Sequence, residues 1–316
     1  MYSYTMIQWV FFFYLYCFLG WVVESFYVSL KSRKLVNRGF MRGPFLPLYG
    51  SGAIMMLVVS MPFQDNPVLV YVAGCIGATA LEYVTGVTME ALFKVRYWDY
   101  SQNKFNFQGH ICLFTTLAWG FLTILMTEVV HRPIEAFVLS LPQSLLSVMT
   151  YALTAGIAAD FALSFKAALD LRDVLVRMEK AKEELLHIRA RLDALIAAAG
   201  EDISGYRESF AEVKESIEEK LEHMKNLAAV SADAAEEKVT EDGDAQKPES
   251  RWSGIRRELQ ELRANYLKNV EERRKLGALR DFFQKALIAA HPSMYSERFK
   301  EALEELRQNL KDGTDK

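Results

Sequence analysis

The sequence predicts an all-α, polytopic membrane protein with about five transmembrane helices, followed by a cytoplasmic helical or coiled-coil domain. The charge distribution supports this: residues 1–165 hold 9 Lys or Arg and 8 Asp or Glu, whereas residues 166–316 hold 28 and 32. Apolar runs long enough to cross a bilayer, about 20 residues each, fall within the first part. A single soluble globule is therefore excluded, and the net charge of −3 argues against a nucleic-acid partner.

Five apolar runs form the expected membrane domain, residues 1–165. They cover approximately residues 5–30, 44–61, 67–93, 111–130 and 142–165. The second run is the shortest, and its prolines stand at its start, where proline is tolerated in a helix. Pro142 is expected to begin the fifth run, which leaves 131–141 at the membrane interface. The lipid bilayer is thus the first partner that the sequence implies.

The positions of Lys and Arg in the short loops predict the orientation. The first loop, the third loop and the start of the tail together hold thirteen of them, whereas the N-terminus, the second loop and the fourth loop hold one. Positive residues near membrane helices favour the cytoplasmic side. The N-terminus is therefore expected outside the cell and the tail in the cytoplasm, which an odd number of spans requires.

Ionisable residues inside the expected spans are the most informative feature. Glu24, Glu82, Glu90 and Asp160 each lie within an apolar run. A charged carboxylate at mid-helix costs about 3 kcal/mol on insertion scales, so such residues usually face a protein interior or water. Two interpretations stay open with similar weight: helix–helix contacts with one structural ion pair, or a substrate or ion pathway. Catalytic carboxylates are a minor alternative.

Two polar loops are expected at the same depth as the glutamates. Residues 37–52 are rich in glycine and proline, which suits a turn leading into a broken helix start, and residues 98–109 are rich in hydrogen-bonding side chains. Trp98 has a second interpretation, as an interfacial anchor. We predict one inward-facing polar cavity, with Arg38 beside Glu24 or Glu82. The candidate pathway residues are Glu24, Asn37, Arg38, Tyr49, Glu82, Glu90, Trp98, Asp99, Asn103 and Asn106.

Several short motifs in this region resemble a known family. They are Gly20-Trp21…Glu24, Asn37 to Gly50, Glu82…Thr85-Gly86…Met89-Glu90, Trp98 to Ser101, Asn106-x-x-Gly109 and Trp119-Gly120. In order and spacing they resemble the ABC-transporter type IV permease family, the CmpB-like group of small bacterial membrane proteins, over about residues 10–130. The resemblance implies a transport component in the plasma (inner) membrane of a bacterium. It does not extend to the charged tail.

The tail is expected to form three parts. Residues 166–228 carry apolar residues three and four apart, from Leu171 to Leu195 and again from Tyr206 to Met224, which is typical of coiled-coil helices. Residues 229–251 have the composition of a flexible linker, and residues 252–316 are expected to form C-terminal helices. The apolar stripes fit either helices that fold back on one another or a surface for self-association or a partner.

Three functions remain compatible with the sequence. The chain has no G-x-x-x-x-G-K-[ST] loop, no H-E-x-x-H and no G-x-S-x-G, so no catalytic residue, metal or cofactor is expected, and a transporter would need a separate ATPase subunit. A permease-like component is favoured, with self-association through membrane helices or the tail as an option. The alternatives are a scaffold or signalling protein acting through the tail, and an enzyme on lipid-linked substrates that uses Arg38 for a phosphate.

The predicted topology can be tested by cysteine labelling in intact cells. In a variant without Cys17, Cys75 and Cys112, a cysteine at Asp65 should react with an impermeant maleimide, because the second loop is expected outside. A cysteine at Gln102 should react only after the cells are opened. Labelling of position 102 from outside would contradict the five-helix topology.

Overall fold

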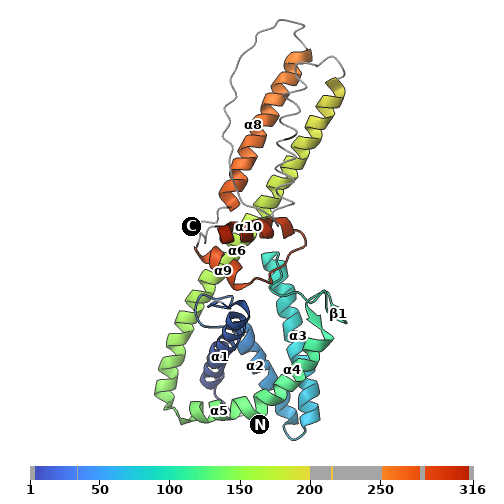
Figure 1. Cartoon of the computed structure of the whole chain (residues 1–316). Helices are drawn as coiled ribbons and strands as arrows, with labels where there is room; N and C mark the ends of the chain where they lie inside the picture. The colour runs from blue at the N-terminus through green and yellow to red at the C-terminus, as the bar shows by residue number, and fades with distance from the viewer. Residues whose placement is uncertain (1–3, 34, 200–214, 216–250, 278–281, 313–316) are drawn as a thin grey trace. The chain divides into compact units, whose positions relative to one another are not determined.

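The computed structural model describes residues 4–33, 35–199, 215, 251–277 and 282–312 (Figure 1). Its helices are α1 (Met6–Ser32), α2 (Pro47–Ser60), α3 (Pro67–Phe93), α4 (Leu113–Leu125), α5 (His131–Ser140), α6 (Gln143–Ala199), α8 (Arg251–Gly277), α9 (Phe282–Ala290) and α10 (Lys300–Asp312). A 3-10 turn (Met61–Phe63) follows α2, and a π-helix (Met126–Val130) joins α4 to α5. The predicted all-α class is confirmed.

Four helical stretches are long and apolar enough to cross a membrane. They are Met6–Lys31, Pro67–Phe93, Leu113–Ser140 and Gln143–Arg191, whereas the apolar stretch Pro47–Phe63 is shorter. The chain is therefore a membrane protein with four candidate spans, and the fifth span at 44–61 stays a prediction. Residues 131–141 are expected at the membrane interface. Helix α5 covers all of them but the last, and it turns away from the direction of α4 in Figure 1.

Local sequence signals explain where the helices begin and end. Pro47 and Pro67 occupy the first turns of α2 and α3, where the missing N–H is not needed. The Asn66 side chain accepts hydrogen bonds from the first amides of α3. Lys94 ends α3 in the left-handed conformation, with φ of 61°, and its N–H donates to the Glu90 carbonyl. The chain is thereby turned sharply after the last carboxylate of α3.

Glycines bring the helices of the bundle into backbone contact. A Cβ atom on Gly20 would lie 2.3 Å from the Tyr49 Cβ, and one on Gly50 would lie 2.8 Å from the Phe13 carbonyl oxygen, so α1 and α2 cross at these glycines. A Cβ atom on Gly74 would lie 2.1 Å from the Thr123 Oγ1. Small residues allow such close packing where lipid provides no hydrophobic driving force between helices.

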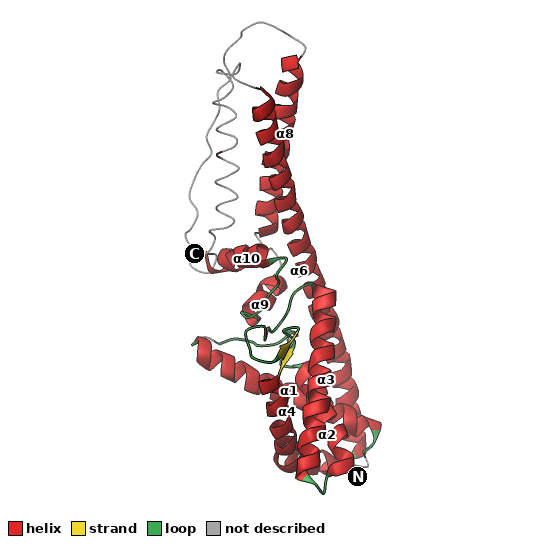
Figure 2. Ribbon diagram, turned by 90° about the vertical axis from the view of Figure 1, so that its right-hand side faces the viewer, coloured by secondary structure: helices red, strands yellow, loops and turns green. Residues whose placement is uncertain are grey.

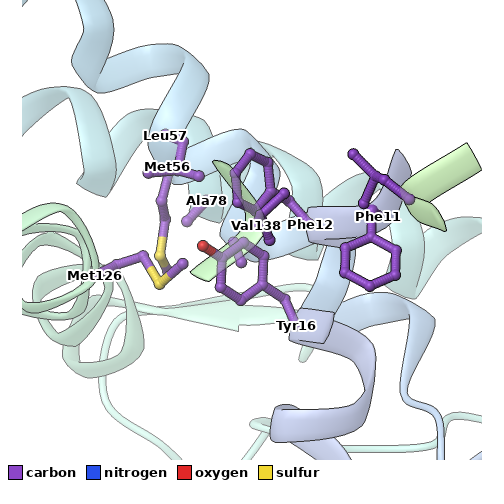
Figure 3. Packing of buried hydrophobic residues seen from close by; sticks show 10 residues of the cluster. Phe11, Phe12, Tyr16, Met56, Leu57, Ala78, Met126 and Val138 are labelled. Carbon is purple, nitrogen blue, oxygen red and sulfur yellow. The ribbon is translucent and has the colours of Figure 1, made fainter. Parts of the chain in front are cut away.

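The buried core of the bundle gathers side chains from α1 to α5 and from the start of α6. Figure 3 shows Phe12, Tyr16 and Val138 turned toward one another, with Met56 and Met126 closing the group. The Tyr16 hydroxyl lies 2.6 Å from the Nδ1 of His131, which is fully buried, so this polar pair is satisfied inside the core.

A small hairpin interrupts the helical architecture. Strands β1 (Asn106–Phe107) and β2 (Ile111–Cys112) pair in antiparallel fashion, with Asn106 opposite Cys112, between α3 and α4 (Figure 2). Gly109 at the turn has φ of +72°, a conformation that favours glycine. The sequence patterns did not predict these strands.

The chain divides into two compact units. Unit 1 comprises residues 1–172 and 281–296, and unit 2 comprises residues 173–280 and 297–316. Helix α6 continues from the apolar residues of the expected fifth span into the charged tail as one 57-residue helix. The expected linker 229–251 lies outside the described residues except for Arg251, as do residues 200–228 except for Glu215.

Unit 2 is built from the charged part of α6 together with α8 and α10. The apolar stripe of α6 is buried at Leu175, Met178 and Leu185. Arg273 of α8 donates to the Met178 carbonyl at 3.1 Å and to the Glu305 carboxylate of α10 at 2.7 Å. The described helices therefore fold back on one another within one chain. Self-association through this stripe stays a prediction.

Two glycine-to-alanine substitutions should separate close packing from helix propensity. Gly74→Ala places a Cβ against Thr123, so we expect it to lower the free energy of unfolding by about 1–3 kcal/mol. Gly156→Ala, in α6, meets no atom within 4 Å and should leave stability unchanged or slightly raised. Thermal unfolding in the same nanodiscs measures both. Equal unfolding midpoints for the two variants would show that α3 and α4 are not closely packed at Gly74.

Candidate functional site

Glu24 joins α1 to α2 and to the loop that follows α1. The Tyr49 hydroxyl donates to one carboxylate oxygen at 2.6 Å, and the Arg38 Nε donates to the other at 3.5 Å. The backbone N–H of Arg38 donates to the Ser25 Oγ at 3.1 Å, which holds the loop against α1. The Arg38 and Glu24 side chains are 16% and 25% exposed. Arg38 is therefore positioned to neutralise Glu24, the first of the two glutamates expected beside it.

The loop after α1 is fastened at several points. The Trp21 Nε1 donates to the Asn37 Oδ1, and the Asn37 Nδ2 donates to the Arg42 carbonyl at 2.7 Å. Asp160 of α6 accepts from the backbone amides of Gly43 at 2.8 Å and Arg42 at 3.3 Å. Asn37 and Asp160 thus set the shape of the loop that carries Arg38.

Glu82, on α3, is held by neutral donors. It is 6% exposed, and it accepts from the Trp119 Nε1 at 2.9 Å and from the Tyr100 hydroxyl at 3.1 Å. Burial, followed by the Glu82 carboxylate, raises the pKa of Tyr100, and Cys112 and Glu24 add to the shift in the same direction. The Glu82 carboxylate thus acts on Tyr100 through a direct hydrogen bond, and the Glu24 carboxylate adds a smaller electrostatic effect.

Glu90, near the end of α3, has two basic partners. The Arg96 Nε donates to its carboxylate at 2.9 Å, and the Nε2 of His110 lies 3.0 Å from the same oxygen. Arg96 also reaches Asp99, with Nη1 at 3.4 Å. The His110 side chain is 5% exposed, so a buried imidazole and a guanidinium share this carboxylate.

The remaining predicted residues build the loop between α3 and α4. The Trp98 indole donates to the His110 carbonyl at 3.0 Å. The Asn103 side-chain amide lies 3.5 Å from the Cys112 sulfur, and the Asn106 amide donates to the Asn103 carbonyl at 2.8 Å. These side chains hold the loop that supplies Tyr100 and Arg96 to the glutamates.

The structure thus sorts the ten predicted residues into two roles. Glu24, Arg38, Tyr49, Glu82, Glu90 and Asp99 belong to the carboxylate groups, whereas Asn37, Trp98, Asn103 and Asn106 shape the two loops. The prediction omitted four donors that contact the glutamates, namely Arg96, Tyr100, His110 and Trp119. Tyr100 and Trp119 lie within the motifs that resemble the family, and this position is the sequence feature that could have identified them.

An apolar pocket of about 420 Å³ lies between α3, α4 and the hairpin. Its lining includes Cys75, Ile76, Tyr83 and Phe107, and none of the ten predicted residues. The inward-facing polar cavity accordingly stays a prediction. Within the described ranges, no group of three His, Cys, Asp or Glu side chains is placed to hold a metal ion.

A double-mutant cycle tests the Arg38–Glu24 pair. Because removing one partner leaves the other charge uncompensated, Arg38→Ala combined with Glu24→Gln should destabilise less than the sum of the single changes, by about 1–3 kcal/mol. The exposed Arg132–Glu128 pair is the control, with an expected coupling of about 0.3–0.5 kcal/mol. The measurement is the free energy of unfolding in bicelles. Additivity at the first pair, or rescue of Arg38→Ala by Glu82→Gln instead, would contradict the pairing.

Comparison with known proteins bears on the membrane-spanning part. Residues 11–165 match a family model described as "Putative ABC-transporter type IV". No curated protein and no solved structure matches the chain. The matched range contains the carboxylate groups and both loops, which confirms the resemblance that the motifs indicated. Residues 11–165 of this chain, which include most of its four candidate membrane spans, match this ABC-transporter type IV family.

Proposed function

We propose that the chain is a permease-like component of a bacterial transporter, with its tail in the cytoplasm and a separate ATPase subunit as partner. The family assignment supports a transporter-related membrane protein. The substrate-contacting region in this proposal is the carboxylate region, defined as Glu24, Glu82 and Glu90 with their donors Tyr49, Tyr100, Trp119, Arg38, Arg96 and His110.

The observation that carries the proposal is the way each glutamate is held. The donors to Glu24, Glu82 and Glu90 come from α2, α4 and both loops, so the region depends on several elements of the chain. Three carboxylates within apolar helices are expensive, at about 3 kcal/mol each on insertion scales, and membrane proteins place such groups at substrate or ion pathways. The glycine contacts and the apolar core already pack these helices, so helix packing does not require the carboxylates.

A second function has its own support. Unit 2 has a buried apolar stripe and a largely buried ion pair between Arg273 and Glu305, whose side chains are 7% and 13% exposed. A module of this kind suits a scaffold that binds protein partners. Partners recovered without any ATPase would favour this function over transport.

Purification of the full chain from native membranes tests the first proposal. After mild cross-linking, the tagged chain at native abundance should retain an ATP-hydrolysing subunit. Glu82→Gln should lower the rate of ATP hydrolysis in the purified complex at least fivefold without lowering the amount of complex, because it replaces a carboxyl oxygen that accepts from Trp119 or Tyr100 by an amide group.

Glu128→Gln is the matched control, since Glu128 is 47% exposed and pairs with Arg132 on the same helical stretch as Trp119. It should leave hydrolysis unchanged. Absence of an ATPase from the cross-linked complex, or equal hydrolysis by the Glu82→Gln and Glu128→Gln complexes, would overturn the proposal.

A further inference from the structure

A segment from the C-terminal part of the chain belongs to unit 1. We call residues 282–296 the return segment: it consists of α9 and the six residues after it. Its neighbours in sequence, residues 173–280 and 297–316, form unit 2. The segment therefore leaves unit 2, packs within unit 1 and returns to unit 2. It also lies outside the range that matches the family, residues 11–165.

The return segment pairs with the chain just after α3. Arg96 and Tyr295 exchange two backbone hydrogen bonds, of 2.7 and 2.9 Å, as an antiparallel bridge. The Ser296 hydroxyl donates to the Lys94 carbonyl at 2.9 Å, and the Ser293 hydroxyl donates to the Tyr97 carbonyl at 3.3 Å. The segment thus fixes the stretch whose Arg96 side chain holds Glu90.

The same segment also contacts Arg38. The Arg38 Nη1 donates to the carbonyl of Ala290, the last residue of α9. Carbonyls at the end of a helix carry a partial negative charge and favour a cation. Both arginines that pair with glutamates in the carboxylate region, Arg38 and Arg96, are therefore bonded to the return segment.

A histidine is buried at this contact. The ring of His291 meets the ring of Tyr97 edge to face, with centroids 4.9 Å apart, and its Nδ1 bonds to the Leu287 carbonyl at 3.0 Å. His291 is 6% exposed and Met294 is 2% exposed. Burial, together with the Arg38 guanidinium, lowers the pKa of His291 to about 3. The Tyr97 phenol packs against the ring, and the charged group that acts on the ring electrostatically is the Arg38 guanidinium, which is bonded to the neighbouring Ala290 carbonyl.

We propose that the return segment is a releasable lid over the arginine–glutamate pairs of unit 1, and that unit 2 controls its release. Two features favour release. A nine-residue helix is marginal once it loses its packing. The chain continues from the lid into unit 2 at both ends, so a partner that changes the conformation of unit 2 can displace the lid. The contacts of the lid do not depend on whether the chain takes part in transport. The effect of the lid on substrate access rests on the proposed function.

The sign of the pH effect follows from His291. In the released segment, His291 has an ordinary pKa near 6.5. Docking of the segment lowers the pKa of His291 to about 3, so the docked segment binds the proton more weakly. Docking is therefore fully favourable above about pH 6.5 and weakens as the pH falls from there toward 3. At pH 5.0 the docking equilibrium should be weaker by roughly 30-fold than at pH 7.5.

Cysteine labelling of the full chain in nanodiscs tests the lid. In the background without Cys17, Cys75 and Cys112, Met294→Cys should react with a maleimide far more slowly than Lys285→Cys, an exposed position on α9, at pH 7.5. The ratio of the two rates cancels the pH dependence of the reagent. The ratio should move toward 1 at pH 5.0 and in an Arg38→Gln background, and His291→Gln should remove the response to pH.

Hydrogen exchange of the unsubstituted chain gives a second readout in case Met294→Cys misfolds. The amide of Tyr295 should be protected at pH 7.5, with a protection factor that falls roughly 30-fold at pH 5.0 after correction for the intrinsic rate. Equal labelling of both cysteines at pH 7.5 would show that the segment is not docked. Protection that persists at pH 5.0 and in Arg38→Gln would show a permanent structural element. Neither readout depends on ATP hydrolysis, so failure of the lid and failure of the proposed function are distinguishable.

Discussion

Charge within apolar helices is the constraint on which the rest of unit 1 depends. Glu24, Glu82 and Glu90 cannot be exposed to lipid as bare carboxylates, because an unpaired charge in a medium of low dielectric constant is strongly disfavoured. Each is satisfied by donors from other elements, and those donors require both interhelical loops to adopt fixed shapes. The glycine contacts, the left-handed end of α3 at Lys94 and the hairpin then follow as the means of bringing the donors within reach.

Much of this arrangement is readable from the sequence, because it depends on local patterns. Apolar runs predict helices, and charges inside them stand out against the expected cost. Arg38 is expected near Glu24 or Glu82 because it lies in a loop shaped by glycines and prolines and because arginine is always charged, and the structure places it beside Glu24. The donors to Glu82 are harder to foresee, since tyrosine and tryptophan are also common as apolar or interfacial residues, and their hydrogen bonds become visible only in the fold.

The position of the return segment could not be predicted for a different reason. Its bridge to Arg96 joins residues about 200 positions apart through backbone groups, which every sequence possesses. Hydrophobic periodicity describes which face of a helix is buried but not what covers it. The boundary expected at residue 165 shows the same limit: composition changes there, yet α6 continues without interruption, since a helix satisfies its own backbone in lipid and in water alike.

The pairing of Arg38 with Glu24 has an electrical consequence. An intact ion pair carries no net charge, so a transmembrane voltage exerts no net force on it. If the pair lies within the membrane field, a movement of Arg38 with its loop, with Glu24 fixed in α1, would displace a unit charge through part of that field. A full crossing corresponds to about 2.3 kcal/mol per 100 mV. For a pair at that depth, opening would be sensitive to membrane potential, whereas rearrangement of the hydrogen bonds from Tyr100 and Trp119 to Glu82 would move only neutral side chains.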